Sequence, residues 1–171
     1  MRERLTVGRL HAFMRALGQA AKADGRVYVT GGATAVLFGW RESTLDIDIK
    51  IIPDRDEILR EIAALKEALQ INVELASPDD FIPPLPGWEE RSRFIAREGR
   101  ITFLHYDFFG QALAKIERGH EIDRRDVRAM IDAGLVDLSR LKELFRAIEP
   151  DLYRYPAIDP ARFRRAVESI H

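Results

Sequence analysis

The sequence contains no cysteine among its 171 residues. Disulfide bonds and thiolate metal sites are therefore excluded, and a reducing cytoplasm is the expected compartment. No stretch approaches the ~20 apolar residues of a membrane-spanning helix, and the charged start MRERLTVGRLHAF lacks the apolar core of a signal peptide. We therefore expect a cytoplasmic protein with no membrane partner.

The chain also lacks a large net charge. The formal charge is −1 and the pI is about 6.4, so the whole molecule does not have the basic character of a typical nucleic-acid-binding protein. Residues 1–30 are nevertheless locally basic, and their apolar spacing predicts an amphipathic helix. Its basic face is interpreted as solvated, with RNA contact as the alternative. The expected inward-facing residues of this segment are Leu5, Leu10, Phe13, Met14 and Leu17.

Repeats and low-complexity tracts are absent, and the composition, 46% apolar and 32% charged, is that of an ordinary globular domain. Period-two alternation predicts strands near residues 26–30, 45–52, 71–76 and 101–106. Helical spacing predicts a helix in the first part of residues 1–30 and helices near residues 33–40 and 54–70. From Gln111 onward the chain is expected to be helical, with helices that end at Gly119, Gly134 and Pro150 and a last one in DPARFRRAVESI. The expected fold is α+β, a small mixed sheet flanked by helices, with residues 1–110 as the core. Residues 111–171 are expected to form a helical extension packed on that core as one compact unit.

A proline-rich stretch, residues 76–90, interrupts this pattern. It is interpreted as an ordered loop, because Phe81, Ile82, Leu85 and Trp88 are expected to be buried. Two roles remain open for it: one wall of a binding cleft, or packing on the edge of the sheet.

A Gly-Gly pair follows the first predicted strand in the sequence RVYVTGGATAVLFGW. Gly31 and Gly32 would let the backbone approach a ligand, and the following helix start would offer N–H groups to phosphate. Taken alone, the pair is more typical of an ordinary turn. The next strand strengthens the phosphate interpretation.

Two aspartates lie in that strand, TLDIDIKII. Asp46 and Asp48 alternate with Ile47 and Ile49, so their carboxylates share one face, ~7 Å apart along the strand. Like charges held this close favour a divalent cation between them. The alternative is an exposed strand face on which Lys50 is the partner of the aspartates.

A third acid is expected for two-metal phosphoryl chemistry. Glu74 in INVEL supplies it, because the alternation with Val73 and Leu75 puts Glu74 on the polar side of its strand. Asp107 is the second candidate, although capping of the helix that opens near Phe109 is the preferred interpretation of that residue.

The chain order of these features resembles the nucleotidyltransferase superfamily of DNA polymerase β, which has a Gly-Gly turn, an Asp-x-Asp pair and an acid on a further strand. The closer resemblance is to DUF6036-type nucleotidyltransferases, and through them to the AbiEii-like toxins of toxin–antitoxin systems. It extends over most of the chain, through GGATAVLFGWRESTLDIDIKIIP, LKEALQINVELASPDDFIPPLPGWEERSRFI, HYDFFGQALAKIERGHEIDRRDV and LYRYPAIDPARFRRAV.

The resemblance implies a minimal nucleotidyltransferase fold, a nucleoside triphosphate substrate and Mg²⁺ or Mn²⁺ as cofactor. It implies that metal binding and catalysis involve Asp46, Asp48 and Glu74. It also implies nucleotide binding by Gly31, Gly32, Thr34, Arg41, Ser43, Thr44, Lys115, Asp123 and Asp126. For Lys115 a solvated helical lysine is the alternative, and His120 in its polar turn is expected to be inert. Glu74 departs from the family pattern, in which this acid is commonly aspartate.

The implied reaction is in-line attack of an acceptor hydroxyl on the α-phosphorus, with release of pyrophosphate. An RNA or tRNA acceptor, with a cognate antitoxin as partner, follows from the AbiEii-like resemblance. A small-molecule acceptor of the aminoglycoside kind is the alternative, served by a cleft with acids at Asp79, Asp80, Glu89 and Glu90. A protein acceptor, or a binding module without catalysis, completes the set of hypotheses.

Overall fold

A computed structural model describes residues 2–171 and divides the chain into two compact units. The sheet unit contains the residues up to Ser77 together with Arg93–His105, and the helical unit contains Pro78–Ser92 and Tyr106–His171. Within the described residues, no helix is long and apolar enough to cross a membrane.

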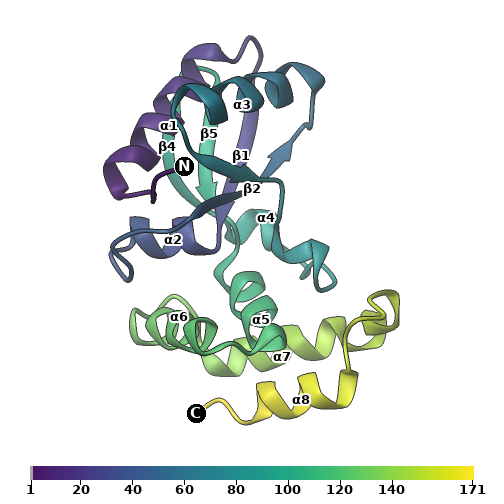
Figure 1. The fold of residues 1–171 in the computed structure, drawn as a ribbon. Coiled ribbons are helices and arrows are strands. Elements are labelled where there is room, and N and C mark those ends of the chain that lie inside the picture. Colours follow the sequence, from purple (N-terminus) through teal and green to yellow (C-terminus); the bar gives the residue numbers. More distant parts are fainter. Residues whose placement is uncertain (1) are drawn as a thin grey trace. The chain divides into compact units, whose positions relative to one another are not determined.

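The sheet unit holds a five-stranded mixed sheet, which confirms the α+β prediction (Figure 1). The strand order is β3-β2-β1-β5-β4; β1 runs antiparallel to β2 and parallel to β5, while β3 runs parallel to β2. The strands are β1 Gly25–Thr30, β2 Asp46–Ile52, β3 Asn72–Glu74, β4 Arg93–Glu98 and β5 Ile101–His105. The helices of this unit are α1 Val7–Ala20, α2 Gly32–Leu37 and α3 Asp56–Ala68.

Strand β4 is the one strand of this sheet that the sequence analysis missed. Its sequence, RFIARE, mixes charged and apolar residues, and Phe94 is 61% exposed, so the stretch lacks the burial pattern of an inner strand. It lies at the edge of the sheet, paired antiparallel with β5 and with an irregular register between Phe94 and Ala96. An edge strand can carry such charge because only one of its sides is paired.

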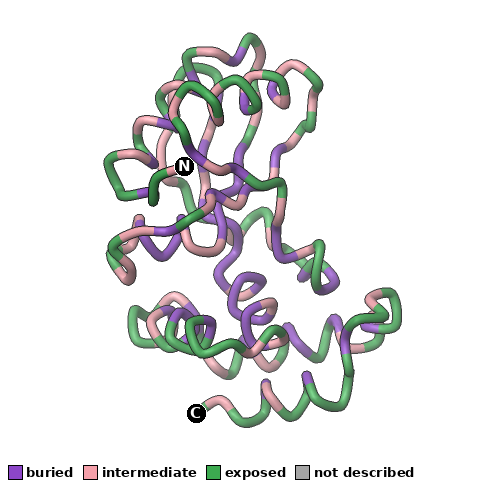
Figure 2. The backbone as a smooth tube through the Cα atoms, in the orientation of Figure 1, coloured by how far each residue is buried: buried purple, intermediate pink, exposed green. Residues whose placement is uncertain are grey.

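One face of the sheet carries the core of this unit. Side chains from β1, β2, β3 and β5 meet α1 and α3 there, and Leu10, Phe13, Met14 and Leu17 of α1 are buried as expected. Figure 2 shows buried and more exposed positions alternating along β2, where the pattern of burial runs from Asp46 to Ile52 with period two. This alternation directs Asp46 and Asp48 to the opposite face.

Two arginines of the basic N-terminal segment have a structural role. Arg2 donates to the carbonyl of Ile71 and pairs with Glu67, and Arg9 donates to the carbonyl of Leu69. These carbonyls follow the C-terminal end of α3, where cations are favourable. Part of the positive charge of this segment therefore belongs to the architecture of the sheet unit.

The helical unit is built around α5, most of which is buried (Figure 2). Its other helices are α4 Trp88–Arg91, α6 Glu121–Asp132, α7 Leu138–Ile148 and α8 Pro160–Glu168, with α5 spanning Phe108–Arg118 and 3₁₀ turns at Pro78–Asp80 and Glu149–Arg154. The predicted ends near Gly119, Gly134 and Pro150 are confirmed. Gly119 takes the left-handed conformation that closes α5.

The proline-rich stretch groups with the helical unit from Pro78 onward. Ile82 and Leu85 are buried, and Trp88 stacks on Tyr106 with ring centroids 4.6 Å apart. The expected burial of Phe81 was wrong, because its side chain is 55% exposed. Leu75, expected beside Val73 in the core, is also exposed, because β3 ends at Glu74 and the alternation stops there.

Candidate active site

The glycine turn and the second aspartate of β2 lie in contact. Gly31 has φ +66° and ψ −136°, a conformation that residues with a side chain rarely adopt. A Cβ added to Gly31 would lie 2.8 Å from Asp48 Oδ2. The register explains this, since Thr30, the residue before the turn, is the cross-strand partner of Asp48. Gly31 is therefore required both for its backbone conformation and for the room that the carboxylate takes.

The second glycine makes room for the loop that precedes β2. A Cβ at Gly32 would lie 2.2 Å from Thr44 Oγ1 and 3.1 Å from the guanidinium of Arg41. Thr44 is buried, and its hydroxyl donates to the backbone carbonyl of Asp46 at 3.3 Å. The turn thus gathers the predicted phosphate contacts Arg41 and Thr44 beside the start of α2.

The N-terminal segment fixes this loop from the other side. Leu5 and Thr44 exchange two backbone hydrogen bonds of 2.7 and 3.0 Å, and Arg4 Nε donates to Ser43 Oγ at 2.7 Å. The sequence pattern gave no sign of this bridge, because its members are about 40 residues apart. The bonds of this bridge hold Ser43 and Thr44 in place, and Arg41 is not one of its members.

Helix α2 contributes little electrostatically to an anion site. It has six residues, so its macrodipole is small. Any attraction for phosphate at this turn therefore comes mainly from the backbone N–H groups and from Arg41, rather than from the helix as a whole.

Thr34 is directed into the protein and is fully buried. Its hydroxyl lies 3.0 Å from His105 Nδ1 and donates to the Val29 carbonyl at 3.3 Å. Burial, and secondarily the charge of Arg93, lowers the pKa of His105 to about 4, so that this histidine is neutral at pH 7. The geometry does not support the predicted contact between the Thr34 side chain and phosphate.

The acids of β2 and β3 share one face, and an amide lies between two of them. Asp48 pairs with Glu74 and Asp46 with Asn72 in the parallel register of β2 and β3. Asn72 Nδ2 donates to Asp46 Oδ1 and, at 3.2 Å, to Glu74 Oε1. Asn72 is a site residue that the sequence analysis missed, although its position two residues before Glu74 on the same strand face was a usable signal.

These oxygens suit a hard cation. Mg²⁺ in proteins is held by one or two carboxylates and completes its shell with water and substrate phosphates. Asp46 and Asp48 provide that pair beside the turn, and Glu74 is exposed on the neighbouring strand. Across residues 2–171, no three histidine, aspartate or glutamate side chains converge into a site that would hold a metal ion by themselves.

Asp107, the second candidate for the third acid, is committed to the helical unit. It caps α5 by accepting from Phe109 N, and both of its oxygens accept from the guanidinium of Arg91, at 3.1 and 2.8 Å. The carboxylate is 1% exposed. This geometry agrees with the capping interpretation.

The three remaining predicted residues form a buried cluster in the helical unit. Lys115 Nζ lies 2.8 Å from Asp126 and 3.7 Å from Asp123, and all three side chains are nearly inaccessible. The alternative of a solvated Lys115 was wrong, because the lysine faces two acids of the adjacent helix. Burial alone would raise the pKa of Asp123, but the hydrogen bonds and charge of Arg118, with the charge of Lys115, bring it below its ordinary value. His120 is exposed and its backbone N–H is bonded to Asp123 in a capping box.

A family model described as "Nucleotidyltransferase of unknown function (DUF6036)" matches residues 6–167, nearly the whole chain. No curated protein sequence and no solved structure matches the chain significantly.

Proposed function

Because this chain belongs to the DUF6036 family of nucleotidyltransferases, we propose that it moves a nucleoside monophosphate from a nucleoside triphosphate to a hydroxyl acceptor at the turn formed by Gly31 and Gly32. The observation that carries the proposal is the contact between this turn and Asp48. A phosphate-binding backbone and a metal-binding carboxylate are thereby adjacent, which is the arrangement that phosphoryl transfer needs.

Each residue has a defined part. The N–H groups of the turn and the guanidinium of Arg41 bind the phosphates, and Asp46 and Asp48 hold the divalent cation. Bound Mg²⁺ supplies neutralisation of charge on the phosphates and makes the acceptor hydroxyl easier to deprotonate. Glu74 lies beside Asp48 on β3 and is proposed as the third carboxylate, on the side of the acceptor.

The reaction balances without a covalent enzyme intermediate. The acceptor oxygen forms a bond to the α-phosphorus as the bond from that phosphorus to the bridging oxygen breaks. Pyrophosphate leaves, and the proton of the acceptor hydroxyl passes to solvent or to a carboxylate. Positioning and electrostatic stabilisation supply the rate enhancement.

Asn72 is proposed to orient the carboxylates before the cation binds. Its amide donates to both Asp46 and Glu74, so it holds two like charges at a fixed spacing. Removing the amide should leave the charges in place and disturb their arrangement. We therefore expect Asn72→Ala to weaken metal-dependent nucleotide binding less than loss of either aspartate.

We propose RNA, and specifically a tRNA hydroxyl, as acceptor, with a cognate antitoxin as partner, on the resemblance to AbiEii-like toxins. The basic N-terminal segment gives only part of its positive charge to an RNA surface, because Arg2 and Arg9 bind carbonyls near the end of α3. The acceptor must therefore be identified directly.

The experiment incubates purified protein with each α-labelled nucleoside triphosphate, Mg²⁺ and total cellular RNA. We expect label to move into RNA, and Asp46→Asn and Asp48→Asn each to abolish the transfer while the unfolding midpoint stays near that of the wild type. Asp54→Asn, the same change at an exposed position just after β2, is the matched control and should be active.

Two results would overturn parts of the proposal. Label that moves to a small alcohol or to a protein, and not to RNA, would replace the RNA acceptor. A wild-type protein that binds triphosphate and Mg²⁺ but labels nothing across all three acceptor classes would favour a binding module over an enzyme.

A further inference from the structure

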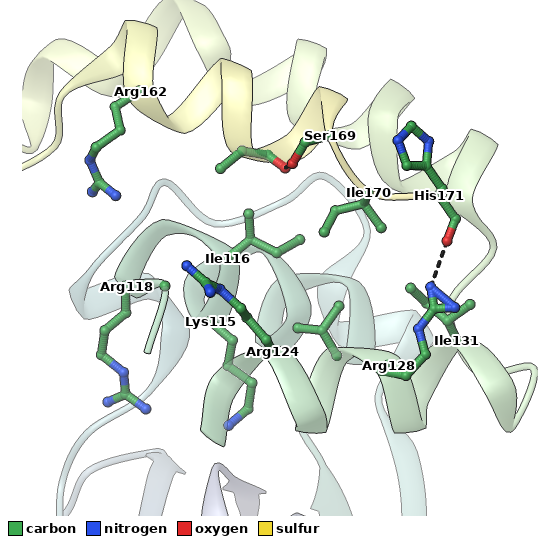
Figure 3. A pocket seen from close by; sticks show the side chains of 13 residues that line it. Lys115, Ile116, Arg118, Arg124, Arg128, Ile131, Arg162, Ser169, Ile170 and His171 are labelled. Atoms are coloured by element: carbon green, nitrogen blue, oxygen red, sulfur yellow. Dashed lines mark hydrogen bonds between the residues drawn. The ribbon is translucent and has the colours of Figure 1, made fainter. Parts of the chain in front are cut away.

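A cavity of about 530 Å³ lies in the helical unit, between α5, α6, α8 and the residues that follow α8 (Figure 3). Its size is within the range of small-molecule pockets. All the residues that line it come from position 115 onward. The nucleotide site proposed above uses none of the guanidinium groups that line this cavity.

The charged lining is cationic throughout. Arg118, Arg124, Arg128 and Arg162 border the cavity, and no aspartate or glutamate is among its lining residues in the described chain. Figure 3 shows Arg118, Arg124 and Arg162 toward one side and Arg128 toward the other. Lys115 contributes only its hydrocarbon stem, because its ammonium group is turned to Asp126.

The floor of the cavity is apolar. Ile116 of α5, Val127 and Ile131 of α6 and Ile170 after α8 line the cavity, and Figure 3 shows Ile116 between Arg162 and Arg128. A surface that binds only the backbone of a polyanion has no need of such a floor. The combination of an aliphatic floor and a guanidinium rim fits a ligand with an apolar body and an anionic end.

Three of the arginines are held in place by acids outside the lining. Arg118 pairs with Asp123, Arg128 lies 3.8 Å from Asp132, and Arg162 lies 3.3 Å from Glu117. Arg128 also donates to the backbone oxygen of His171 at 2.5 Å, and Arg162 to the carbonyl of Glu117 at 2.9 Å. A guanidinium has five N–H donors, so the printed bonds of Arg128 and Arg162 orient these two groups without using every donor. Such pre-orientation lowers the entropy lost when an anion binds.

Arg124 is the exception and the most informative residue. Its exposed side chain makes no ion pair with any acid in residues 2–171, whereas each of the other three arginines of the lining pairs with one. Repulsion among like charges at the cavity is relieved when an anion enters. A bound anion would supply the counter-ion that Arg124 lacks, and the apolar floor would contact the rest of the ligand.

We propose that this cavity is a second ligand site, one that binds a small molecule with an apolar body and a carboxylate or phosphate group. The proposal does not depend on the transferase chemistry at the glycine turn. Arg124 supplies the uncompensated charge, Arg118, Arg128 and Arg162 supply further donors, and the isoleucines and Val127 contact the apolar body.

The test uses two fluorescent probes of nearly the same shape. Anilinonaphthalene sulfonate carries an anionic group, and N-phenyl-1-naphthylamine is its neutral analogue. We expect one sulfonate probe to bind per folded chain, and Arg124→Ala to raise its Kd about fivefold or more without changing the Kd of the neutral probe. Arg125→Ala is the matched control, because Arg125 is the next residue of α6, is exposed and pairs with Glu121. The Arg125→Ala variant should bind the sulfonate probe with the Kd of the wild type.

A second pair of variants tests the location by volume instead of charge. Ala166 lines the cavity and Ala161 is exposed on the same helix. Ala166→Trp should remove binding of the sulfonate probe, whereas Ala161→Trp should preserve it. Thermal unfolding of all four variants confirms that each is folded before the Kd is measured.

Competition identifies the anionic group. Nonanoate and octyl phosphate carry the same octyl chain, so the stronger displacer of the probe shows whether carboxylate or phosphate is preferred. Equal probe affinity in Arg124→Ala and Arg125→Ala, or retained binding in Ala166→Trp, would overturn the proposal. Displacement by an RNA oligonucleotide but by neither small anion would also overturn it and would identify a nucleic-acid surface.

Discussion

Replacing Gly31 by alanine tests the geometry on which the proposed active site depends. The backbone at Gly31 has a positive φ, with φ +66° and ψ −136°, and a residue with a side chain held in this sparsely populated region costs about 1–3 kcal/mol. The new Cβ would in addition lie 2.8 Å from Asp48 Oδ2, closer than real contacts allow, so the carboxylate must move. We therefore expect Gly31→Ala to lower the free energy of unfolding by about 1–3 kcal/mol and to displace Asp48.

A matched glycine separates the two effects. Gly39 also has a positive φ, +81°, but a Cβ there would meet nothing within 4 Å. Gly39→Ala should therefore cost about 1–2 kcal/mol through backbone strain alone. Both variants can be measured by urea unfolding, with the free energy taken from the linear extrapolation.

A double-mutant cycle with Asp48→Ala isolates the contact. If the carboxylate is the obstacle, its removal relieves part of the cost of Gly31→Ala, and the double variant should be more stable than the sum of the single changes by about 0.5 kcal/mol or more. The cycle of Gly39→Ala with Asp48→Ala should be additive within about 0.5 kcal/mol. Additivity in both cycles would refute the close approach of Asp48 to the turn.

The functional measurement uses the same glycine pair. Nucleotide binding in the presence of Mg²⁺ should weaken at least about tenfold in Gly31→Ala, which corresponds to about 1.4 kcal/mol, and should change little in Gly39→Ala. Equal loss in the two variants would mean that general destabilisation, and not the position of Asp48, limits binding.

Three further predictions concern the interior. The pKa of His105 is lowered to about 4, so between pH 6.5 and pH 4 the unfolded chain binds a proton at this residue and the folded chain does not. The contribution of His105 to the free energy of unfolding is complete above pH 6.5 and should fall by about 3 kcal/mol by pH 4. Unfolding measured against pH should show a shallower fall for His105→Asn. Lys115→Met should cost about 3–5 kcal/mol, because it leaves Asp126 charged and buried, and adding Asp126→Leu should recover part of that loss in chemical denaturation. Asp107→Ala should destabilise the protein, because it removes both the cap of α5 and the partner of Arg91. Asp107→Ser keeps a capping oxygen, so this variant should be more stable than Asp107→Ala by about 1 kcal/mol in the same assay.

Each of these has an outcome that contradicts it. Parallel pH profiles for the wild type and His105→Asn would mean that another group dominates between pH 6.5 and 4. No recovery in the double variant of Lys115 and Asp126 would show that the lysine is not held by that acid. Equal stability of the serine and alanine variants at position 107 would exclude capping as the role of Asp107.

Local periodicity was enough for much of the candidate site. Alternation in DIDIKII placed Asp46 and Asp48 on one face, because successive side chains of a strand point to opposite sides whatever the rest of the fold does. Capping and glycine signals likewise located the ends of α5 and α6. The resemblance of the motifs to DUF6036 nucleotidyltransferases is confirmed by the match over residues 6–167.

These local patterns could not predict which residues distant in the sequence pair with one another. Sequence spacing indicated that Glu74 was on a polar face, but only the register of β2 and β3 put it opposite Asp48 and brought Asn72 to Asp46. Burial of Thr34 also depended on a partner 71 residues away, His105, that no local pattern identifies.

The sequence by itself determined four of the five strands, the face on which Asp46 and Asp48 lie and the family. The tertiary structure alone decided which of the polar residues are paired: Lys115 is buried against two acids, while Arg124 in the next helix has none in the described chain. Both residues look like ordinary helical cations in the sequence. Their difference arises because the charge state and contacts of a side chain depend on the neighbours that folding brings to it, and periodicity specifies a direction but not a neighbour.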